Sequence, residues 1–360
     1  MTRLVIISLG TLSGTLLEVA ARRARFDEIV IASRDLQKAT AKANNARIGA
    51  ALEGKYPRIT PEHFDMYASD AASRLRDFGA DVIFAAPSMM PWWRLQHLSS
   101  GKLNWLAAAP FATFMACHLA PMRHLRDVVV TAGISQPWIG ASSPDVVNAV
   151  LQRTGAAPLC GTGNVAEVVP KIALAVGTRL DVDPSEVEIK LVAQHAFEYF
   201  CYGDGNGHPP PYLLQVSRRG EDLTELAHAS LLTPYPFPYQ LDFNLVTVSA
   251  TNTVLEALIQ TEPVATHVPA PSGRVGGYPV LISSTGVALN LAPQWTEQQA
   301  VEVNEAALSF DGIEEIGIDG TIRFTDGCAA AIQRLTGSKI THLCAEDAQY
   351  LADALAGALA

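Results

Sequence analysis

The sequence predicts an α/β protein that begins with a doubly wound parallel sheet and continues into an α+β part. Three observations predict it: an apolar strand at residues 4–7, a small-residue turn at 8–15 that opens a helix, and a second apolar strand at 28–32. A continuous apolar run is typical of a strand that is covered on both faces, as in parallel sheets. Strand, helix and strand in this order start a βαβ unit.

The elements continue in alternating order along the first half of the chain. The patterns indicate a helix within 36–60, a strand near 64–66, a helix at 71–78, a strand at 80–87, a helix at 103–117, a strand at 127–131 and a helix from 144. Pro144 and Asp145 stand where helix starts prefer them. We therefore expect residues 1–150 to form one domain around the parallel sheet.

After residue 150 the pattern changes to that of an α+β domain, expected at 151–360. Its elements are a helix opened by Glu167, a strand ending at His195, a loop at 203–211, a strand at 212–217, a helix at 252–259, strands at 265–270, 276–283 and 287–291, a helix at 296–308, a strand pair around Ile316 and Ile322, and helices near Ala329 and Ala348. Glycine and proline cluster in the 203–211 segment, which is typical of a loop.

Charge and cysteine content exclude several classes of partner. The formal net charge is −10 and there is no long basic run, so neither nucleic acid nor a membrane surface is an expected partner. The five cysteines are scattered and form no Cys-x-x-Cys pair, so we expect reduced thiols in a cytoplasmic protein, with neither disulfides nor a metal site. The apolar N-terminal run is too short for a signal peptide, and no stretch is long enough to span a bilayer.

The turn at residues 8–15 is a degenerate form of the Gly-x-Gly-x-x-Gly pattern that binds dinucleotides in Rossmann-type domains. Small residues there let backbone amides approach a pyrophosphate at the helix N-terminus. The glycine positions fall on Ser8, Gly10 and Ser13, or Gly10 and Gly14 carry the turn if the spacing is one residue longer. A tight turn without a ligand is the alternative interpretation. The candidate phosphate-binding residues are Ser8, Gly10, Thr11, Leu12, Ser13 and Gly14.

The end of the second strand indicates which dinucleotide binds. An acidic residue there would bind the ribose hydroxyls and repel a 2′-phosphate, whereas this chain has Ser33 followed by Arg34. This favours NADP(H) over NAD(H), although Arg34 is alternatively a solvated surface charge. The ends of later strands should lie along the same cofactor, which adds Ala85, Ala86, Pro87 and Ser143.

A segment rich in tryptophan follows Pro87. Trp92 and Trp93, followed by Arg94, are placed to form a lid or a wall of a substrate site. An apolar lid excludes water from the chemistry. Packing of the two tryptophans on the core or at a subunit contact is the alternative.

A strand-end histidine and a carboxylate that opens a helix form the candidate catalytic pair. His195 ends an apolar strand, and Glu167 follows a Gly-Thr-Gly turn. Imidazole exchanges a proton near neutral pH, and a carboxylate beside it orients the ring and stabilises its charged form. A core histidine bonded to the backbone is the alternative interpretation of His195.

Several segments, taken in order, resemble the lactate and malate dehydrogenase family over most of the chain. They are residues 27–31, 80–86, 142–147, 161–167, 192–196 and 278–287. The resemblance implies a dinucleotide domain followed by a catalytic α+β domain. It also implies that His195, in Ala-Gln-His-Ala, is the catalytic histidine and that Glu167 is its partner carboxylate.

The chain departs from the family where the family binds its substrate. The substrate-carboxylate arginine falls on Pro170, with Lys171 beside it, and the arginine-bearing mobile loop falls on a segment whose only basic residue is Arg94. A family asparagine falls on Ser143. Loss of a bidentate arginine is hard to reconcile with a small 2-hydroxy acid. We therefore expect a substrate bulkier and less anionic than malate or lactate, near Trp92, Trp93, Arg94 and Lys171.

The resemblance implies an oxidoreductase that transfers hydride to or from a carbonyl or hydroxyl group of a small molecule, with a His195–Glu167 proton relay. Ser33 and Arg34 make NADP(H) its expected cofactor. Homodimers or homotetramers are usual in the family. Two other enzyme classes stay open: an imine reductase of the opine or saccharopine type, and a metal-dependent enzyme like the family 4 glycoside hydrolases, which would need a thiolate such as Cys160 or Cys201. A nucleotide-sensing protein without catalysis is a further alternative.

Overall fold

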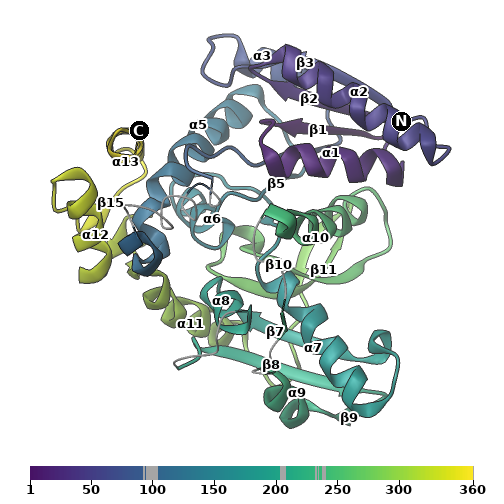
Figure 1. Ribbon diagram of the computed structural model, residues 1–360, viewed down its shortest axis with the longest axis vertical. Coiled ribbons are helices and arrows are strands. Elements are labelled where there is room, and N and C mark those ends of the chain that lie inside the picture. Colours follow the sequence, from purple (N-terminus) through teal and green to yellow (C-terminus); the bar gives the residue numbers. More distant parts are fainter. Residues whose placement is uncertain are drawn as a thin grey trace.

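The computed structural model of the chain describes residues 1–91, 94, 104–202, 208–231, 233, 235–236 and 241–359. Figure 1 shows a parallel sheet with its helices at one end, an antiparallel sheet with its helices at the other, and the C-terminal elements along one side. Within the described residues, no helix is long and apolar enough to cross a membrane.

The first sheet has six parallel strands in the order β3-β2-β1-β4-β5-β6. The strands are β1 (Arg3–Ile7), β2 (Glu28–Ser33), β3 (Arg58–His63), β4 (Val82–Ala85), β5 (Trp138–Gly140) and β6 (Cys160–Gly161). This is the strand order of Rossmann domains, so the predicted doubly wound sheet is confirmed. The strand order reverses between β1 and β4, and ligands of such sheets bind at the carboxyl ends of the strands at that point.

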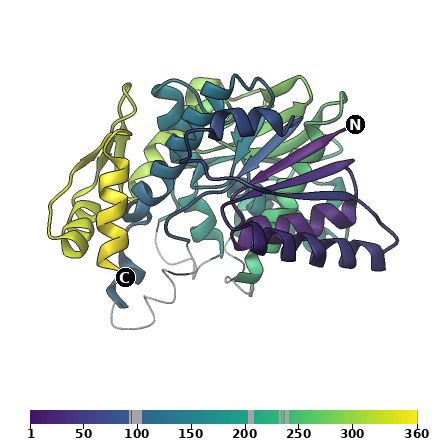
Figure 2. The same ribbon diagram turned by 90° about the horizontal axis from the view of Figure 1, so that it is seen from above.

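Helices cover both faces of this sheet because its strands are apolar on both faces. In β1, Leu4 and Ile6 pack with α1 (Thr11–Arg23) and α2 (Leu36–Leu52). Val5 and Ile7 point to the other face, toward α3 (Ala71–Asp77), α5 (Met115–Ala132) and α6 (Pro144–Arg153). Figure 2 shows the purple strands between these two helical layers.

The strand predicted at 127–131 is wrong, because these residues belong to α5. Three consecutive valines favoured a strand, but the buried positions Leu125, Val128, Val129 and Ala132 recur at helical spacing, while Val130 is 57% exposed. The helix predicted at 103–117 is replaced by two 3₁₀ turns, η1 (Asn104–Ala108) and η2 (Phe111–Phe114), before α5 begins. The helix predicted to begin at Asn252 begins earlier, at Asn244.

The second sheet is antiparallel, with the order β10-β11-β7-β8-β9 and with β12 paired to β11. Its strands are β7 (Glu188–Ala193), β8 (Tyr212–Arg218), β9 (Glu221–Asp222), β10 (Val264–Pro269), β11 (Gly277–Ser283) and β12 (Gly286–Leu289). The helices of this part are α7 (Val165–Leu180), α8 (Ala196–Tyr202), α9 (Thr224–Leu231), α10 (Asn244–Ala257) and α11 (Glu297–Ala307). Short 3₁₀ turns are η3 (Pro184–Glu186), η4 (Leu241–Phe243), η5 (Pro271–Gly273) and η6 (Leu308–Asp311). The predicted α+β second part is confirmed.

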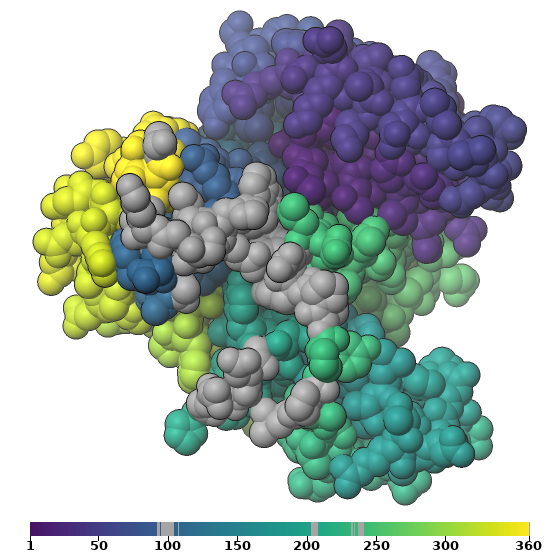
Figure 3. Space-filling view, in the orientation of Figure 1, coloured from purple at the N-terminus to yellow at the C-terminus, as the bar shows by residue number. Residues whose placement is uncertain are grey.

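The two parts of the chain are joined by packing as well as by sequence. Helix α10 packs on α1, and Figure 3 shows the green and purple segments in contact on this face. The C-terminal strands β13 (Ile313–Ile316), β14 (Ile322–Phe324) and β15 (His342–Leu343) form a third sheet. With it, α12 (Asp326–Thr336) and α13 (Ala348–Ala358) share a core with α5. The domain boundary at residue 150 stays a prediction.

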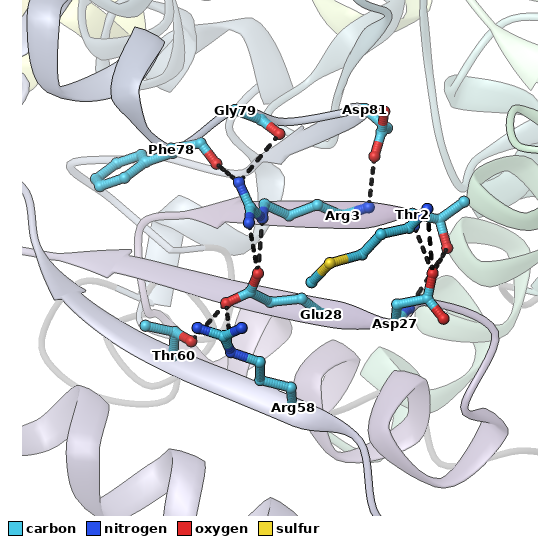
Figure 4. Close-up of polar contacts among 10 residues, drawn as sticks. Thr2, Arg3, Asp27, Glu28, Arg58, Thr60, Phe78, Gly79 and Asp81 are labelled. Carbon is cyan, nitrogen blue, oxygen red and sulfur yellow. Dashed lines mark hydrogen bonds and ion pairs between the residues drawn. The ribbon is translucent and has the colours of Figure 1, made fainter.

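A buried carboxylate ties the amino ends of three strands together, at the opposite edge of the sheet from the carboxyl ends. Glu28 begins β2 and is 2% exposed. It accepts hydrogen bonds from Arg3 (2.8 Å) and Thr60 (2.7 Å) and pairs with Arg58 (3.1 Å), as Figure 4 shows. Burial raises the pKa of Glu28, but the bonds from Thr60 and Arg3 lower it more, so the carboxylate stays charged. The cluster links β1, β2 and β3, and removal of one partner would leave a buried charge uncompensated.

Candidate active site

The N-terminus of α1 has the backbone geometry of a phosphate-binding turn. Ser8 has a positive φ of 74°, and Gly10 precedes the helix without any side chain capping the first turn. A Cβ atom added at Gly10 would meet no heavy atom within 4 Å, whereas Ser13 is 1% exposed against the core. The three glycines of the fingerprint have three roles: the first makes the turn, the second leaves the backbone open, and the third allows tight packing. This geometry fits Ser8, Gly10 and Ser13 as the three positions.

A cavity of about 520 Å³ lies between this turn and the end of β2. We call it the Arg34 cavity, and its lining includes Ser8, Gly10, Ser33, Arg34, Asp35, Lys38, Tyr67, Pro87, Ser88 and Gln349. The Asp35 carboxylate caps α2 by accepting a hydrogen bond from the Lys38 backbone N–H (2.9 Å). Two basic side chains, those of Arg34 and Lys38, also line this cavity, so it carries more positive than negative charge.

Two further cavities extend from the Arg34 cavity toward His195. The turn cavity, of about 300 Å³, includes Ser8, Gly10, Thr11, Leu12, Ser13, Lys38, Ala86, Ser88, His118, Ala141 and Asn244. The His195 cavity, of about 130 Å³, includes Leu12, Phe111, His118, Ala141, Ser143, Thr162, Asn164, Glu167, His195, Glu198, Tyr199, Asn244 and Thr247. Neighbouring cavities share lining residues, Ser8 and Lys38 at one junction and Leu12 and His118 at the other. They form one channel from Arg34 to His195.

A buried aspartate of α6 holds His195 in place between β7 and α8. The backbone N–H of His195 donates to Oδ2 of Asp145 (2.7 Å), and Asn164 Nδ2 donates to Oδ1 of the same carboxylate (3.0 Å). Asp145 is 2% exposed, and burial raises its pKa to about 6. Because α6 connects β5 and β6 of the first sheet while β7 belongs to the second, this bond fixes His195 relative to the parallel sheet.

The imidazole of His195 is oriented by Asp311. Nδ1 of His195 lies 3.0 Å from Oδ2 of Asp311, and the Gln194 side chain donates to the same oxygen (2.6 Å). Asp311 ends η6 and is 3% exposed. With Nδ1 bonded, Nε2 is the ring nitrogen that remains for a substrate. The hydrogen-bonded partner of His195 is thus Asp311, where the sequence had indicated Glu167.

The surroundings of His195 favour its protonated form. Burial lowers the pKa of the imidazole, but the charge and hydrogen bond of Asp311 raise it. The charges of Asp145 and Glu167 raise it further, so the pKa of His195 lies above its usual value. These surroundings therefore stabilise the positively charged form of the ring more than water does.

Glu167 lines the same cavity, and its carboxyl group ionises at a higher pH than an ordinary glutamate. It stands in the first turn of α7 and is 3% exposed. Burial raises the pKa of Glu167 to about 7, against the lowering effects of hydrogen bonds with Thr247 and Glu198. Two carboxyl groups side by side in a buried place share a proton at neutral pH.

Rings form the remaining walls around His195. Phe111 lies with its centroid 4.2 Å from the His195 ring, and Tyr199 meets that ring edge-on at 4.9 Å. His118, on α5, stacks on Phe111 at 6.3 Å. Burial and the charge of His195 lower the pKa of His118 to about 4, so His118 is neutral near pH 7.

No protein-family model matches this sequence, and no curated protein matches it. The minor L-lactate dehydrogenase of Enterococcus mundtii has a similar structure, with a TM-score of 0.58 at 13% identity, over 86% of this chain and 96% of that one. The Plasmodium falciparum malate dehydrogenase in complex with NADH is similar with a TM-score of 0.55 at 11% identity, over 86% of this chain and 96% of that one. The Cryptosporidium parvum lactate dehydrogenase was solved with lactic acid and nicotinamide adenine dinucleotide. Its TM-score to this chain is 0.51 at 16% identity, over 86% of this chain and 98% of that one. The chain has the lactate and malate dehydrogenase fold.

Within this dehydrogenase fold, most of the residues predicted for the cofactor line the channel. Gly14 and Ala85 do not; both lie within helix α1 or strand β4. The residues that do line it are Ser8, Gly10, Thr11, Leu12, Ser13, Ser33, Arg34, Ala86, Pro87 and Ser143. His195 and Glu167, from different elements, line the same cavity.

The residues predicted for the substrate are placed differently. The buried ammonium of Lys171 donates to the backbone carbonyls of Cys201 and Leu231 and does not line the cavity. Arg94 donates to the backbone carbonyl of Leu359 (3.2 Å). Trp92 and Trp93 lie outside the described residues. The described structure therefore brings neither Arg94 nor Lys171 to His195.

Several residues of the site were not identified from the sequence. Asp311 and His118 had no local motif, and they reach the cavity from η6 and α5. Glu198 follows His195 by one turn of helix, a spacing that would have placed it on the same face. Asn164 ends the Gly-Thr-Gly-Asn segment, and an asparagine after glycine in a turn was a sequence signal for it; in the structure its φ is 52°.

The thiols needed for a family 4-like metal site do not reach this cavity. Cys160 lies in β6, is fully buried, and has its pKa raised to about 12 by burial. Burial likewise raises the pKa of Cys201 to about 12. Neither lines the His195 cavity, and within the described residues no three His, Cys, Asp or Glu side chains are arranged to hold a metal ion.

Proposed function

We propose that this chain is a nicotinamide-dinucleotide-dependent oxidoreductase that interconverts a carbonyl and a hydroxyl group of a small-molecule substrate. The observation that carries the proposal is the channel from Arg34, past the N-terminus of α1, to the buried His195–Asp311 pair. Its shape and lining suit an extended dinucleotide whose reactive end meets a proton donor. Similar structures with NADH, or with lactic acid and nicotinamide adenine dinucleotide, support the same assignment.

The residues present fit such a cofactor. The uncapped first turn of α1 offers backbone N–H groups and the positive end of the helix dipole to a pyrophosphate. Gly10 leaves the space above the turn open. At the end of β2, Ser33, Arg34 and Lys38 would hold a 2′-phosphate, which favours NADP(H) over NAD(H).

The protein side of the reaction is a proton transfer at His195. When bound, the nicotinamide supplies or takes the hydride. In the reducing direction His195 Nε2 gives its proton to the carbonyl oxygen as the hydride reaches the carbonyl carbon, so that an alcohol forms. Asp311 holds the ring and stabilises its charge, and Phe111 and Tyr199 restrict water around it. In the oxidising direction the neutral ring takes the proton back.

The cavity supports a substrate less anionic than malate or lactate. Among the described residues, neither Lys nor Arg lines it, while Glu167 and Glu198 do. A substrate carboxylate would meet carboxyl groups there. The expectation of a bulkier substrate rests on Trp92 and Trp93, and it stays a proposal.

Titration with NADPH and NADH tests the proposal directly. The purified chain should bind both, with NADPH bound more tightly, as read from the nicotinamide fluorescence. NADPH consumption with a panel of carbonyl compounds then tests turnover. Failure to bind either dinucleotide contradicts the proposal. The proposed homodimer or homotetramer is tested separately, by sedimentation of the same sample.

A further inference from the structure

The His195 cavity contains more acidic than basic groups. Glu167 and Glu198 line it, and Asp311 and Asp145 lie directly behind His195. His118 is neutral near pH 7, because burial and His195 lower its pKa to about 4. Within the described lining, His195 is the one side chain whose surroundings favour a positive charge, and it is already paired with Asp311. The described part of this lining is therefore acidic as a whole.

Two polar atoms of the cavity lack partners although they are buried. Glu167 is 3% exposed, and among the described residues its Oε1 atom has no hydrogen-bond partner. His118 is 9% exposed, and its Nδ1 atom likewise has none within the part of the chain that the structure describes. Both side chains line the cavity. A buried carboxylate oxygen without a donor costs free energy, so Oε1 of Glu167 points to a ligand that provides a hydrogen-bond donor. Nδ1 of His118 donates or accepts according to the tautomer of the ring, so it offers the ligand a second polar contact.

The neighbouring carboxyl groups specify the charge of that ligand. Glu198 is 4% exposed and hydrogen-bonds with the Glu167 carboxyl group. A pair that shares one proton retains one negative charge. A ligand ammonium would compensate this charge and supply up to three donors. A hydroxyl group supplies one donor and no charge. A carboxylate supplies no donor, and its negative charge is repelled by the carboxyl pair.

We propose that the substrate carries a protonated amino group, which Glu167 and Glu198 bind while His195 acts on a neighbouring carbonyl or hydroxyl group. The proposal rests on the proposed function in taking the His195 cavity as the substrate site. The cavity volume of about 130 Å³ limits how far apart the two groups can be. Since an engineered cavity of about 150 Å³ holds benzene, roughly six heavy atoms fit here. The amino group and the reacting carbon therefore belong to one short fragment of the substrate.

Three methyl ketones of nearly equal size test the proposal. Aminoacetone, hydroxyacetone and pyruvate differ only in the substituent on the carbonyl carbon, which is an aminomethyl, a hydroxymethyl or a carboxylate group. Binding to the full chain is measured at pH 7 by ligand-observed NMR, with and without NADPH, and turnover by NADPH consumption. We expect aminoacetone to bind at least tenfold more tightly than hydroxyacetone, and pyruvate to bind most weakly. A tenfold preference corresponds to about 1.4 kcal/mol.

Two matched variants separate the pair from general charge effects. Glu198→Gln removes the charge and keeps the shape, so it should abolish the preference for aminoacetone over hydroxyacetone. Glu188→Gln removes the same charge from the exposed start of β7, outside the His195 cavity, and should leave the preference intact. NADPH binding by each variant shows that it is folded.

The outcomes distinguish this proposal from the proposed function. A tenfold preference that is lost in Glu198→Gln and kept in Glu188→Gln supports the amino-group site. Equal or tighter binding of hydroxyacetone or pyruvate overturns it, and so does a preference that survives in Glu198→Gln or the absence of binding by any of the three. In each of these cases NADPH binding still supports an oxidoreductase. Lack of NADPH binding contradicts the oxidoreductase, while the NMR series without NADPH continues to decide the amino-group site.

Discussion

Nδ1 of His195 lies 3.0 Å from Oδ2 of Asp311, a residue 116 positions further along the chain. The carboxylate raises the pKa of the imidazole, against the effect of burial. Asp311→Asn keeps the size and removes the charge, so the pKa of His195 should fall. The rate of carbonyl reduction should then decline at a lower pH than in the wild type, and turnover should drop by about tenfold or more. In the oxidising direction, which needs neutral His195, the rising limb should move to lower pH as well. Identical pH–rate profiles would show that Asp311 does not set the pKa of His195.

His195→Asn removes the proposed proton donor itself. Turnover should fall by roughly a factor of 10² to 10⁴, the usual contribution of general acid–base catalysis. NADPH affinity should be retained, because His195 does not line the Arg34 or turn cavities. The matched control is His208→Asn, because His208 is exposed and lies outside any helix or strand. This variant should leave turnover unchanged. Steady-state rates and dinucleotide titrations on the same preparations check both expectations.

The choice of dinucleotide should depend on Arg34 and Lys38. Each lines the Arg34 cavity, and a charged hydrogen bond to a phosphate is worth about 1.5 to 3 kcal/mol. Arg34→Ala should therefore weaken NADPH binding by about tenfold to a hundredfold and leave NADH binding nearly unchanged. Lys55→Ala, an exposed lysine just after α2, serves as the control. An equal loss for both dinucleotides would mean that Arg34 does not recognise the 2′-phosphate.

Glu167 should make the stability of the protein fall as pH rises. Burial raises its pKa from 4.5 to about 7 in the folded chain, so between these values the folded state binds the extra proton. The free energy of unfolding then decreases as pH rises through this range. In Glu167→Gln this loss should disappear, a difference on the order of 2 kcal/mol between pH 5 and pH 8. Asp145 and His118 titrate in both proteins, so they cancel. Urea midpoints at the two pH values measure the effect, and parallel pH dependences of the two proteins would contradict it.

The buried carboxylate at the other edge of the sheet should affect stability alone. Glu28→Gln weakens the bonds to Arg3, Thr60 and Arg58 that Figure 4 shows, and should cost about 2 to 3 kcal/mol of unfolding free energy. Its effect on NADPH affinity should be small, because Glu28 lies at the amino end of β2 and the channel at the carboxyl end. A large loss of affinity at unchanged stability would contradict this separation.

Local patterns were sufficient to predict the parallel sheet. The alternation of apolar strands and helices, with small residues at Ser8, Gly10 and Ser13, is typical of a doubly wound sheet. The same local reasoning failed at 127–131, because three valines favour a strand by propensity while burial at helical spacing decides the structure. Tertiary packing overrides propensity at such sites.

The hydrogen-bond partner of His195 could not be predicted in the same way. His195 and Glu167 were found because each sits beside a turn that the sequence marks. Asp311 follows an ordinary helix, and only the packing of η6 against the turn after β7 brings it to the imidazole. Long-range placement of this kind leaves no spacing signal in a single sequence. Lys171 illustrates the converse, since a cation next to a motif was expected in the site, whereas its ammonium is bonded to two backbone carbonyls.

The C-terminal fifty or so residues provide Asp311 at one end of the channel and Gln349 at the other. During synthesis the chain emerges from the N-terminus onward, and earlier segments fold first. The first sheet and the turn at Ser8 can therefore form while His195 still lacks its carboxylate. In such an order of folding, the turn proposed to bind the dinucleotide forms before Asp311 can orient the His195 ring.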